Sequence, residues 1–185
     1  RVTTSSGPNR QEIKRSLIAR ARNARQRLWI ATAYFIPSRK LRRLMRQAAR
    51  NGLDVRLLLP GSQTDHPAVR HAGRRFYSRL LRNGVRIYEY QPRFLHAKVM
   101  LCDHWVSIGS SNLDRWNFRW NLEANQEALD PALAARVTAL FEDDFAQSVE
   151  YTSEAWHRRP LRKRMAEWFW GTVDLWMNRI SAPRR

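Results

Sequence analysis

Two titratable side chains, His96 and Lys98, stand at alternate positions in the stretch RFLHAKVMLCDHWVSIGSSNL, residues 93–113. Most of the surrounding residues are apolar, so the stretch is predicted to contain a buried strand over about 95–102. Alternate side chains of a strand share a face, which places His96 and Lys98 together, opposite core residues. A histidine and a lysine are costly to bury unless something uses them. Both are therefore candidate functional residues.

Further polar groups are predicted on the same surface from the strands that follow. After a turn, a second strand over about 105–109 ends in the residues GSSN. Gly109 permits a close backbone approach, and Ser110 and Asn112 supply neutral hydrogen-bonding groups. A third strand, in NLEANQEAL, places Glu123 on one of its faces. Three neighbouring strands are thus expected to present one polar surface.

This set of side chains suits a phosphoryl group. Lys98 and Asn112 can bind nonbridging phosphate oxygens, with Ser110 beside them. His96 can attack phosphorus or donate a proton, and Glu123 can hold the imidazole in one tautomer. The five histidines of the chain include no HxH or HxxxH pair, so the residues themselves indicate no metal site.

The segments around this candidate site alternate between strands and helices. Strands are predicted at 27–36, 53–60 and 83–90, and helices at 9–26, 38–50 and 68–81. After the third strand of the site, a helix is predicted over 131–149, a polar connection over 150–159 and a last helix over 160–180. This alternation predicts an α/β domain with a mixed β-sheet flanked by helices.

Three parts are expected along the chain. Residues 1–8 are interpreted as a linker, residues 9–150 as a catalytic domain, and residues 151–185 as a basic and aromatic C-terminal segment at the membrane interface. The helix predicted over 160–180 is amphipathic. Its three tryptophans suit the membrane–water boundary, and its first basic residues suit anionic headgroups. The alternative is that this helix packs on the domain's own core or on another domain.

The composition limits the classes of partner. The 185 residues include 34 Lys and Arg against 16 Asp and Glu, a formal net charge of +18. Such a surface attracts polyanions, either nucleic acid or an anionic membrane. Cys102 is the only cysteine, which excludes an intrachain disulfide and a multi-cysteine zinc site.

Targeting signals are not visible in the sequence. No apolar run of about 18 residues predicts a membrane-spanning helix, and no signal peptide is recognised. The chain begins at Arg1 without a methionine. We therefore expect it to be a piece of a longer protein.

The spacing of the candidate residues resembles the HxKxxxxD…GSxN signature of the phospholipase D superfamily. His96 and Lys98 form HxK, Asp103 follows after four residues, and GSSN at 109–112 completes the pattern. Five residues separate Asp103 from GSSN, where the superfamily usually has six, which predicts a shortened hairpin turn. The resemblance implies a catalytic set of His96, Lys98, Asp103 and Glu123, in which the motif aspartate is usually structural.

More of the chain, over about residues 10–150, is similar to the second catalytic half of bacterial cardiolipin synthases. The stretches YEYQPRFLHAK and NLEANQEALD carry much of this similarity. It implies transphosphatidylation without a metal or other cofactor. A phosphatidyl group would move from one phospholipid to a histidine, and then to a hydroxyl of a second lipid. Phosphatidylglycerol is the expected substrate, with phosphatidylethanolamine as the alternative donor. The expected location is peripheral, on the cytoplasmic side of the bacterial inner membrane.

Enzymes that resemble this chain use two HxK motifs, which face each other across a pseudo-twofold axis. No other histidine of the chain begins HxK, so the chain carries half of a site. In second halves the histidine is more often the acid and base than the nucleophile, which implies that role for His96. The other half is expected from the same native chain or from a second copy, as in small homodimeric nucleases of the superfamily.

Two other functions are compatible with the sequence. A homodimeric phosphodiesterase or nuclease would suit the basic charge. A membrane-binding fragment without catalytic activity would need no second half. Formation of a lipid product separates the first interpretation from both.

Several side chains near the motif have two interpretations. Asp65 and His66 follow a predicted strand, where α/β sheets often bind ligands, or they cap a loop. Three aromatic residues follow GSSN: Trp116, Phe118 and Trp120. We expect these three in the core rather than at a lipid entrance, and we expect Tyr34 in the core too. The arginines of the predicted helix at 38–50 are expected to be solvated surface.

Overall fold

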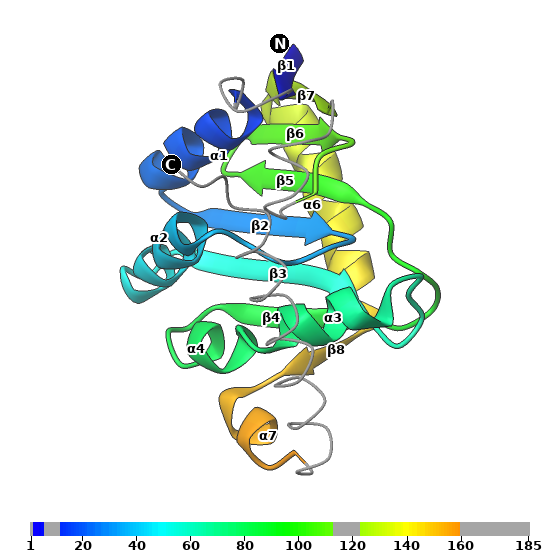
Figure 1. Cartoon of the computed structure of the whole chain (residues 1–185). Helices are drawn as coiled ribbons and strands as arrows, with labels where there is room; N and C mark the ends of the chain where they lie inside the picture. Colours follow the sequence, from blue (N-terminus) through cyan, green and yellow to red (C-terminus); the bar gives the residue numbers. More distant parts are fainter. Residues whose placement is uncertain (1, 6–11, 113–122, 160–185) are drawn as a thin grey trace, which may run out of the picture.

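The computed structural model describes residues 2–5, 12–112 and 123–159 of the chain. Its centre is one eight-stranded sheet with the order β1-β7-β6-β5-β2-β3-β4-β8 (Figure 1). The strands are β1 Val2–Ser5, β2 Arg27–Thr32, β3 Asp54–Pro60, β4 Arg86–Tyr90, β5 Lys98–Cys102, β6 Trp105–Gly109, β7 Glu123–Leu129 and β8 Ser148–Tyr151. The sheet is mixed, as predicted, because β2, β3 and β4 run parallel and all other neighbours run antiparallel.

Helices cover both faces of this sheet. They are α1 Glu12–Asn23, α2 Arg39–Arg50, α3 Pro67–Arg74, α4 Tyr77–Leu81, α6 Pro131–Ala146 and α7 Ser153–His157. α1 to α4 lie on one face, and α6 lies on the other (Figure 1). The start of α2 is fixed by Ser38, whose hydroxyl accepts a hydrogen bond from the backbone N–H of Leu41. Asp130 caps α6 in the same way, just before Pro131 at its first turn.

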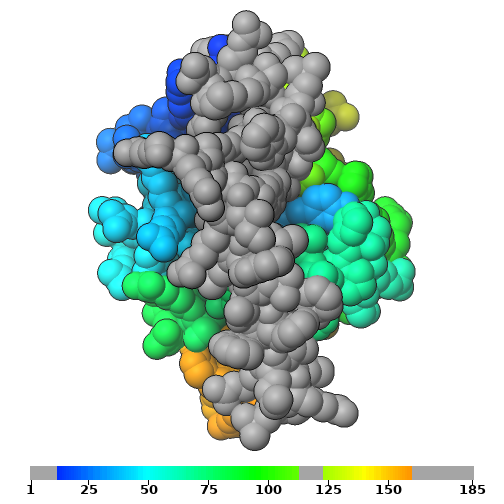
Figure 2. Space-filling view, viewed as in Figure 1, coloured from blue at the N-terminus to red at the C-terminus, as the bar shows by residue number. Residues whose placement is uncertain are grey.

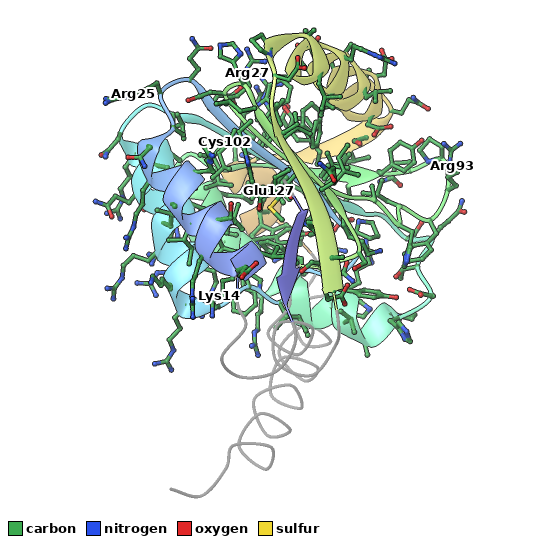
Figure 3. All side chains as sticks on the ribbon, turned by 90° about the horizontal axis from the view of Figure 1, so that it is seen from above. Lys14, Arg25, Arg27, Arg93, Cys102 and Glu127 are labelled. Carbon is green, nitrogen blue, oxygen red and sulfur yellow. The ribbon has the colours of Figure 1, made fainter. Side chains whose placement is uncertain are left out.

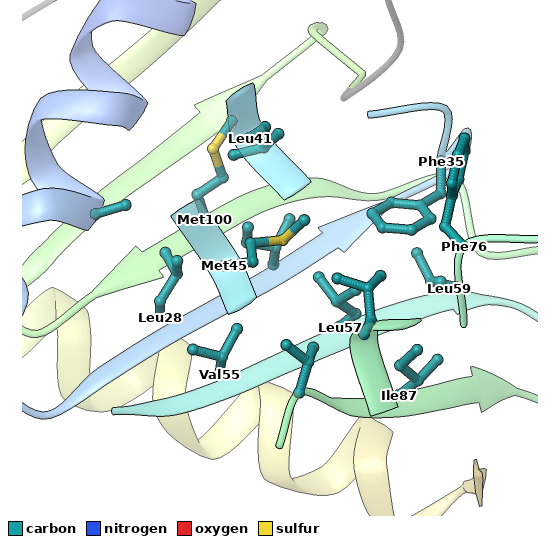
Figure 4. Packing of buried hydrophobic residues seen from close by; sticks show 14 of the residues in the cluster. Leu28, Phe35, Leu41, Met45, Val55, Leu57, Leu59, Phe76, Ile87 and Met100 are labelled. Atoms are coloured by element: carbon teal, nitrogen blue, oxygen red, sulfur yellow. The ribbon is translucent and has the colours of Figure 1, made fainter. Parts of the chain in front are cut away.

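The two faces of the sheet bury two separate apolar clusters. Under α1 to α4, Met45 of α2 packs against strand residues such as Leu28 and Leu57 (Figure 4). Under α6, Trp29 of β2 packs edge-on against Phe141 and Phe145. Burying one such side chain contributes about 1.5–3 kcal/mol to the free energy of folding. Both clusters therefore stabilise the packing of the helices on the sheet. The central strands are apolar on both faces for this reason.

Both edges of the sheet extend beyond the boundaries predicted from the sequence. Residues 2–5, predicted to belong to a linker, form β1 and pair antiparallel with β7. The predicted polar connection at 150–159 contains the end of β8 and the helix α7. Trp156 of α7 is buried in the cluster under α1 to α4. The predicted boundary at 150 therefore falls inside the fold.

Smaller differences from the predicted elements have local causes. The helix predicted at 68–81 is two helices, α3 and α4, which are separated by a turn at 75–76. α6 ends at Ala146, because the residues after it pair with β4 as β8. The helix predicted at 160–180 lies outside the described residues.

Side-chain bonds also tie the helix layer to the far strands of the sheet. Ser16 of α1 donates a hydrogen bond of 2.8 Å to the carboxylate of Glu127 on β7. Glu127 lies near the centre of the molecule when it is seen from above (Figure 3). This bond holds the strand that carries Glu123 against α1.

Candidate active site

His96 lies in the loop that leads into β5, and its side chain is exposed. The prediction of a strand from about residue 95 was therefore wrong at its start. The neighbouring strand β2 pairs with β5 only as far as Thr32, which faces Lys98. Upstream of Lys98 the chain has no partner strand on that side. His96 is consequently free of the burial cost that the sequence implied.

The predicted polar residues line one open pocket of about 540 Å³. Its lining residues are Tyr34, His96, Lys98, Gly109, Ser110, Asn112 and Glu123. They come from the ends of β2, β5, β6 and β7 and from the loops beside them. The pocket thus brings together the predicted histidine, lysine, serine, asparagine and glutamate, and it adds Tyr34, which was expected in the core.

Lys98 occupies the first position of β5 and is partly buried. Its Nζ donates a hydrogen bond of 2.9 Å to the backbone carbonyl of His96. Burial lowers the pKa of Lys98 below the ordinary lysine value, while the nearby carboxylates of Glu123 and Asp65 oppose that shift. Lys98 therefore places an amino group at the pocket wall, and burial makes its protonated form less favourable than that of an exposed lysine.

Ser110 links the GSSN turn to the first residues of β7. Its hydroxyl donates a hydrogen bond to the carboxylate of Glu123, and it accepts one of 3.1 Å from the backbone N–H of Ala124. Within the described residues, Glu123 makes no hydrogen bond to His96. The two side chains line the same pocket, but the predicted contact between them is absent from this arrangement.

Asn112 is held in the pocket lining by Thr32, a residue that the sequence did not single out. Its side-chain oxygen accepts a hydrogen bond of 3.4 Å from the hydroxyl of Thr32, and only 4% of the residue is exposed. Asn125 of β7 supports the same turn, because its oxygen accepts from the N–H of Ser111 and its amide donates to Ser107. A period-two polar pattern in NLEANQ was the signal for Asn125.

Gly109 is required by close contact between strands. A Cβ atom on Gly109 would collide with the carbonyl oxygen of Ala124 and would lie 2.6 Å from the Cα of Asn125. Both obstacles belong to the backbone of β7 or sit directly on it, so they cannot move aside cheaply. The sequence-based prediction of a close backbone approach at Gly109 is confirmed.

Asp103 does not reach the pocket. It follows the last residue of β5, at the opposite end of the strand from Lys98. Its carboxylate accepts hydrogen bonds of 2.8, 2.9 and 3.0 Å from the backbone N–H groups of Arg25, Gln26 and Arg27. Burial would raise its pKa, but these three donors prevail and lower it. These bonds give Asp103 a structural role at the hairpin, as the motif resemblance implies for this aspartate, and its place in the predicted catalytic set stays a prediction.

The hairpin turn at Asp103 is as short as the spacing predicted. Cys102 of β5 pairs directly with Trp105 of β6, which leaves two residues in the turn. Asp103 itself adopts a positive φ of 52°, a conformation that aspartate tolerates better than most residues. The missing residue of the usual motif spacing is accommodated here, away from Asn112.

Family membership follows from the sequence over most of this fold. The sequence model of the family described as the PLD-like domain of cardiolipin synthase matches residues 17–145. The chain belongs to this family. The span matched runs from α1 to the end of α6 and includes every described residue that lines the pocket.

Curated relatives of this PLD-like domain are cardiolipin synthases. Cardiolipin synthase A of Pseudomonas aeruginosa is 40% identical over 141 residues, which cover 76% of this chain and 28% of that protein. Cardiolipin synthase 2 of Bacillus cereus is 37% identical over 166 residues, 88% of this chain and 32% of that protein. The chain therefore spans less than a third of the length of these relatives.

Solved structures share the fold at low identity. The phospholipase D family member Nuc of Salmonella typhimurium superimposes with a TM-score of 0.69 at 17% identity, covering 82% of this chain and 98% of Nuc. Phosphatidylserine synthase of Haemophilus influenzae gives 0.70 at 15% identity, covering 81% of this chain and 39% of that one. Both show that the PLD-like domain has the phospholipase D fold.

Aromatic rings border His96 of this PLD-like domain. The ring of Tyr34 lies 6.2 Å from that of His96 and 5.5 Å from that of His66, and Phe94 lies 5.3 Å from His96. The hydroxyl of Tyr34 donates a hydrogen bond of 2.6 Å to Asp65. The loop with Asp65 and His66 thus sits beside the pocket. Tyr34 faces outward because β2 ends at residue 32.

Two further observations concern metal ligands and membrane-spanning helices. Among residues 12–112 and 123–159, no group of three or more His, Cys, Asp or Glu side chains could hold a metal ion. None of the helices in the described part has the length and apolar character needed to cross a bilayer. Trp116, Phe118 and Trp120 lie outside the described residues.

Proposed function

We propose that this PLD-like domain supplies one of the two HxK half-sites of a phosphatidyltransferase that makes cardiolipin. The single observation that carries the proposal is the convergence of His96, Lys98, Ser110, Asn112 and Glu123 on one open pocket. Membership of the cardiolipin synthase family supports the choice of substrate class. The proposed location is the inner-membrane surface on its cytoplasmic side, where a peripheral protein meets phospholipids.

The proposed reaction has two steps. In the first, a histidine of the other half forms an N–P bond while the bond from phosphorus to the leaving oxygen breaks, and His96 gives that oxygen its proton. In the second, His96 takes the proton of the acceptor hydroxyl, whose oxygen forms a new bond to phosphorus as the N–P bond breaks. Where two copies of this chain form the site, one His96 takes each role.

The remaining pocket residues have supporting roles in this proposal. Lys98 and the amide of Asn112 stabilise the charge that develops on the nonbridging oxygens. Glu123 orients the imidazole of His96 and stabilises its protonated form once substrate has drawn the exposed His96 ring into the pocket. Hydrogen bonding of Glu123 to Ser110 engages one of its carboxylate oxygens and leaves the other to meet the ring.

A mixing experiment tests the proposal and the origin of the second half together. The chain is mixed in varying ratio with its His96→Ala variant on vesicles of phosphatidylglycerol, and cardiolipin and released glycerol are measured. We expect turnover to fall as the square of the wild-type fraction where two copies share a site. Where a separate polypeptide with the first HxK half-site is added in excess, turnover should instead fall linearly with the wild-type fraction. An absence of product in both arrangements would sink the proposal in favour of a membrane-binding fragment.

A homodimeric phosphodiesterase is the second candidate. The observation that favours it is the match to Nuc over 98% of the length of that chain, since a domain of this fold with one such half exists as a short polypeptide. The net charge of +18 suits a polyanionic substrate. Salt-sensitive cleavage of DNA by the isolated chain, without any lipid product, would select this candidate.

A further inference from the structure

A groove lined by arginines lies between α2 and the segment of α3 and α4, apart from the His96 pocket. It has a volume of about 570 Å³. We call it the arginine groove; its walls are Arg39, Arg42, Arg43, Arg46, Arg75 and Arg79. Its floor is apolar, because Phe76 and Leu80 are buried there. It shares no lining residue with the His96 pocket.

The arginine groove continues into two neighbouring hollows. One of about 390 Å³ shares Arg39 and Arg43 with it and reaches Arg22 of α1. The other, of about 540 Å³, shares Arg46 and Arg79 and reaches Arg82. The surfaces of α2 and α4 adjoin each other in the space-filling view (Figure 2). Arginines therefore line a continuous surface from Arg22 of α1 to Arg82 beside α4.

Acidic residues are missing from the sequence around these arginines. No Asp or Glu occurs between Glu12 and Asp54, or between Asp65 and Glu89. In the part of the chain that the structure describes, no salt bridge involves Arg39, Arg43, Arg46 or Arg79. By contrast, Arg70 pairs with Glu89 and Arg86 pairs with Glu150.

Mutual repulsion within the groove is visible at Arg46. Burial lowers the pKa of Arg46, and the like charges of Arg79, Arg50 and Arg43 lower it further. Within the described residues, Arg39, Arg43, Arg46 and Arg79 gather positive charge without a salt bridge, and binding of an anion between them would relieve their mutual repulsion. Arg46 is also fixed in place, since its Nε donates a hydrogen bond of 3.2 Å to the carbonyl of Arg42.

The aromatic floor orients the guanidinium groups. The guanidinium carbon of Arg42 lies 4.2 Å from the ring centre of Phe76, and that of Arg75 lies 4.5 Å from it. Stacking of this kind fixes the plane of each of these two guanidinium groups over the ring. The phosphate contacts are assigned to the other wall residues, Arg39, Arg43, Arg46 and Arg79, because a guanidinium group can meet phosphate oxygens in bidentate geometry.

We propose that the arginine groove binds the headgroup phosphate of an anionic phospholipid in a bilayer surface. A bilayer is the source of phosphate that the charge distribution favours. The acidic residues Glu142, Asp143 and Asp144 are all on α6, across the sheet from the groove. A planar anionic surface attracts the first face and repels the second. The inference does not depend on the proposed chemistry, because the groove excludes His96 and Lys98.

Vesicle sedimentation of the whole chain at physiological salt tests this site. The groove variant is Arg43→Gln/Arg46→Gln/Arg79→Gln. The control variant is Arg25→Gln/Arg93→Gln/Arg136→Gln, which removes the same charge at exposed positions outside the groove; Figure 3 labels two of them. We expect the groove variant to bind phosphatidylglycerol-containing vesicles at least about tenfold more weakly than the control variant, with little binding of either to pure phosphatidylcholine.

Equal weakening by both variants would overturn the site, because general charge would then explain the binding. A larger loss of duplex DNA binding than of vesicle binding in the groove variant would overturn the choice of lipid. Circular dichroism melting checks that the triple variants fold. If the groove variant unfolds, the single change Arg79→Gln, at an exposed position, is expected to weaken vesicle binding about threefold, and no weakening would count against the groove. None of these measurements uses catalytic turnover.

Discussion

The two ends of strand β5 carry parts of one sequence motif but are built in different ways. At the first residue, Lys98 and the adjacent His96 border an open pocket, and within the described chain the imidazole has no hydrogen-bond partner. At the other end, Asp103 accepts three backbone hydrogen bonds. One end places its polar groups at an open pocket, whereas the other uses its carboxylate to fasten the hairpin.

This difference explains the spacing of the motif. β5 runs from Lys98 to Cys102, so the four residues between Lys98 and Asp103 are the rest of the strand. A strand of that length places the lysine at the edge where β2 ends and the aspartate at the edge where β2 begins. In this chain HxKxxxxD therefore describes a pocket end, a strand and an anchor.

Among changes at the pocket end of β5, replacement of His96 should lower the rate of lipid transfer most. We expect His96→Ala to lower the rate of lipid transfer in the complete enzyme by about 10²–10⁴-fold, because one proton-transfer or nucleophilic role is lost. The melting temperature should hardly change, since the side chain is exposed. His104→Ala is the matched control, because His104 is exposed at the Asp103 end. Near-normal turnover in His96→Ala would show that His96 at the pocket end of β5 has no catalytic role.

Loss of the Lys98 charge should cause the second-largest decrease in the rate of lipid transfer. Lys98→Met is expected to lower the rate about 10²–10³-fold, as removal of one charge-stabilising donor does elsewhere. Because the pKa of Lys98 is lowered, the ammonium group deprotonates at a lower pH than an ordinary lysine. The alkaline limb of the pH–rate profile should therefore lie below the usual lysine range and move to higher pH in Lys98→Arg. An unchanged limb in Lys98→Arg would show that another group titrates there.

Glu123→Gln should give a smaller loss of rate. We expect about a 10–100-fold decrease, the range seen when a partner that orients a histidine is removed, with the hydrogen bond from Ser110 preserved. Glu127→Gln is the control on the same strand, since Glu127 bonds Ser16 and lies outside the pocket. Equal rates for both variants would contradict a role for Glu123 at His96.

Asp103→Asn should have the smallest effect on rate and a clear effect on stability. The amide keeps one acceptor oxygen but turns N–H donors toward Arg25, which should cost about 1–2 kcal/mol of the free energy of unfolding. The rate per folded molecule should stay within about twofold. Chemical denaturation and assay of the folded fraction measure the two effects. A stable but inactive Asp103→Asn protein would contradict the division between the two ends.

The same site predicts a pH dependence of stability. The folded-state pKa of Asp103 lies below its unfolded value, so its contribution is present above the unfolded pKa and is lost as pH falls through the folded one. Asp103→Asn should therefore lose most of its stability difference from the wild type in acid. A difference that persists undiminished below both pKa values would point to another cause.

The centre of the fold and most of the pocket could be predicted from the sequence. β2 and β3 are apolar on both faces, and the motif residues have fixed spacing, so their places follow from local pattern. The edge strands β1 and β8 could not be predicted, because short polar segments become strands only through partners far along the chain. His96 and Tyr34 were misplaced for one reason: the end of β2 at Thr32 decides where both neighbours leave the sheet.

The order of strands also sets an order of assembly. β2, β3 and β4 pair through residues such as Leu28 with Val55 and Leu57 with Ile87, which are near one another in sequence. The other pairs join residues far apart in the sequence, because Cys102 of β5 pairs with Leu28 of β2 and Val2 of β1 pairs with Gln126 of β7. Closing long loops slows folding. During synthesis on the ribosome, the parallel strands β2, β3 and β4 can therefore pair before Glu123 and Asn125 have been translated. The pocket lining is complete only once β7 has paired with β6.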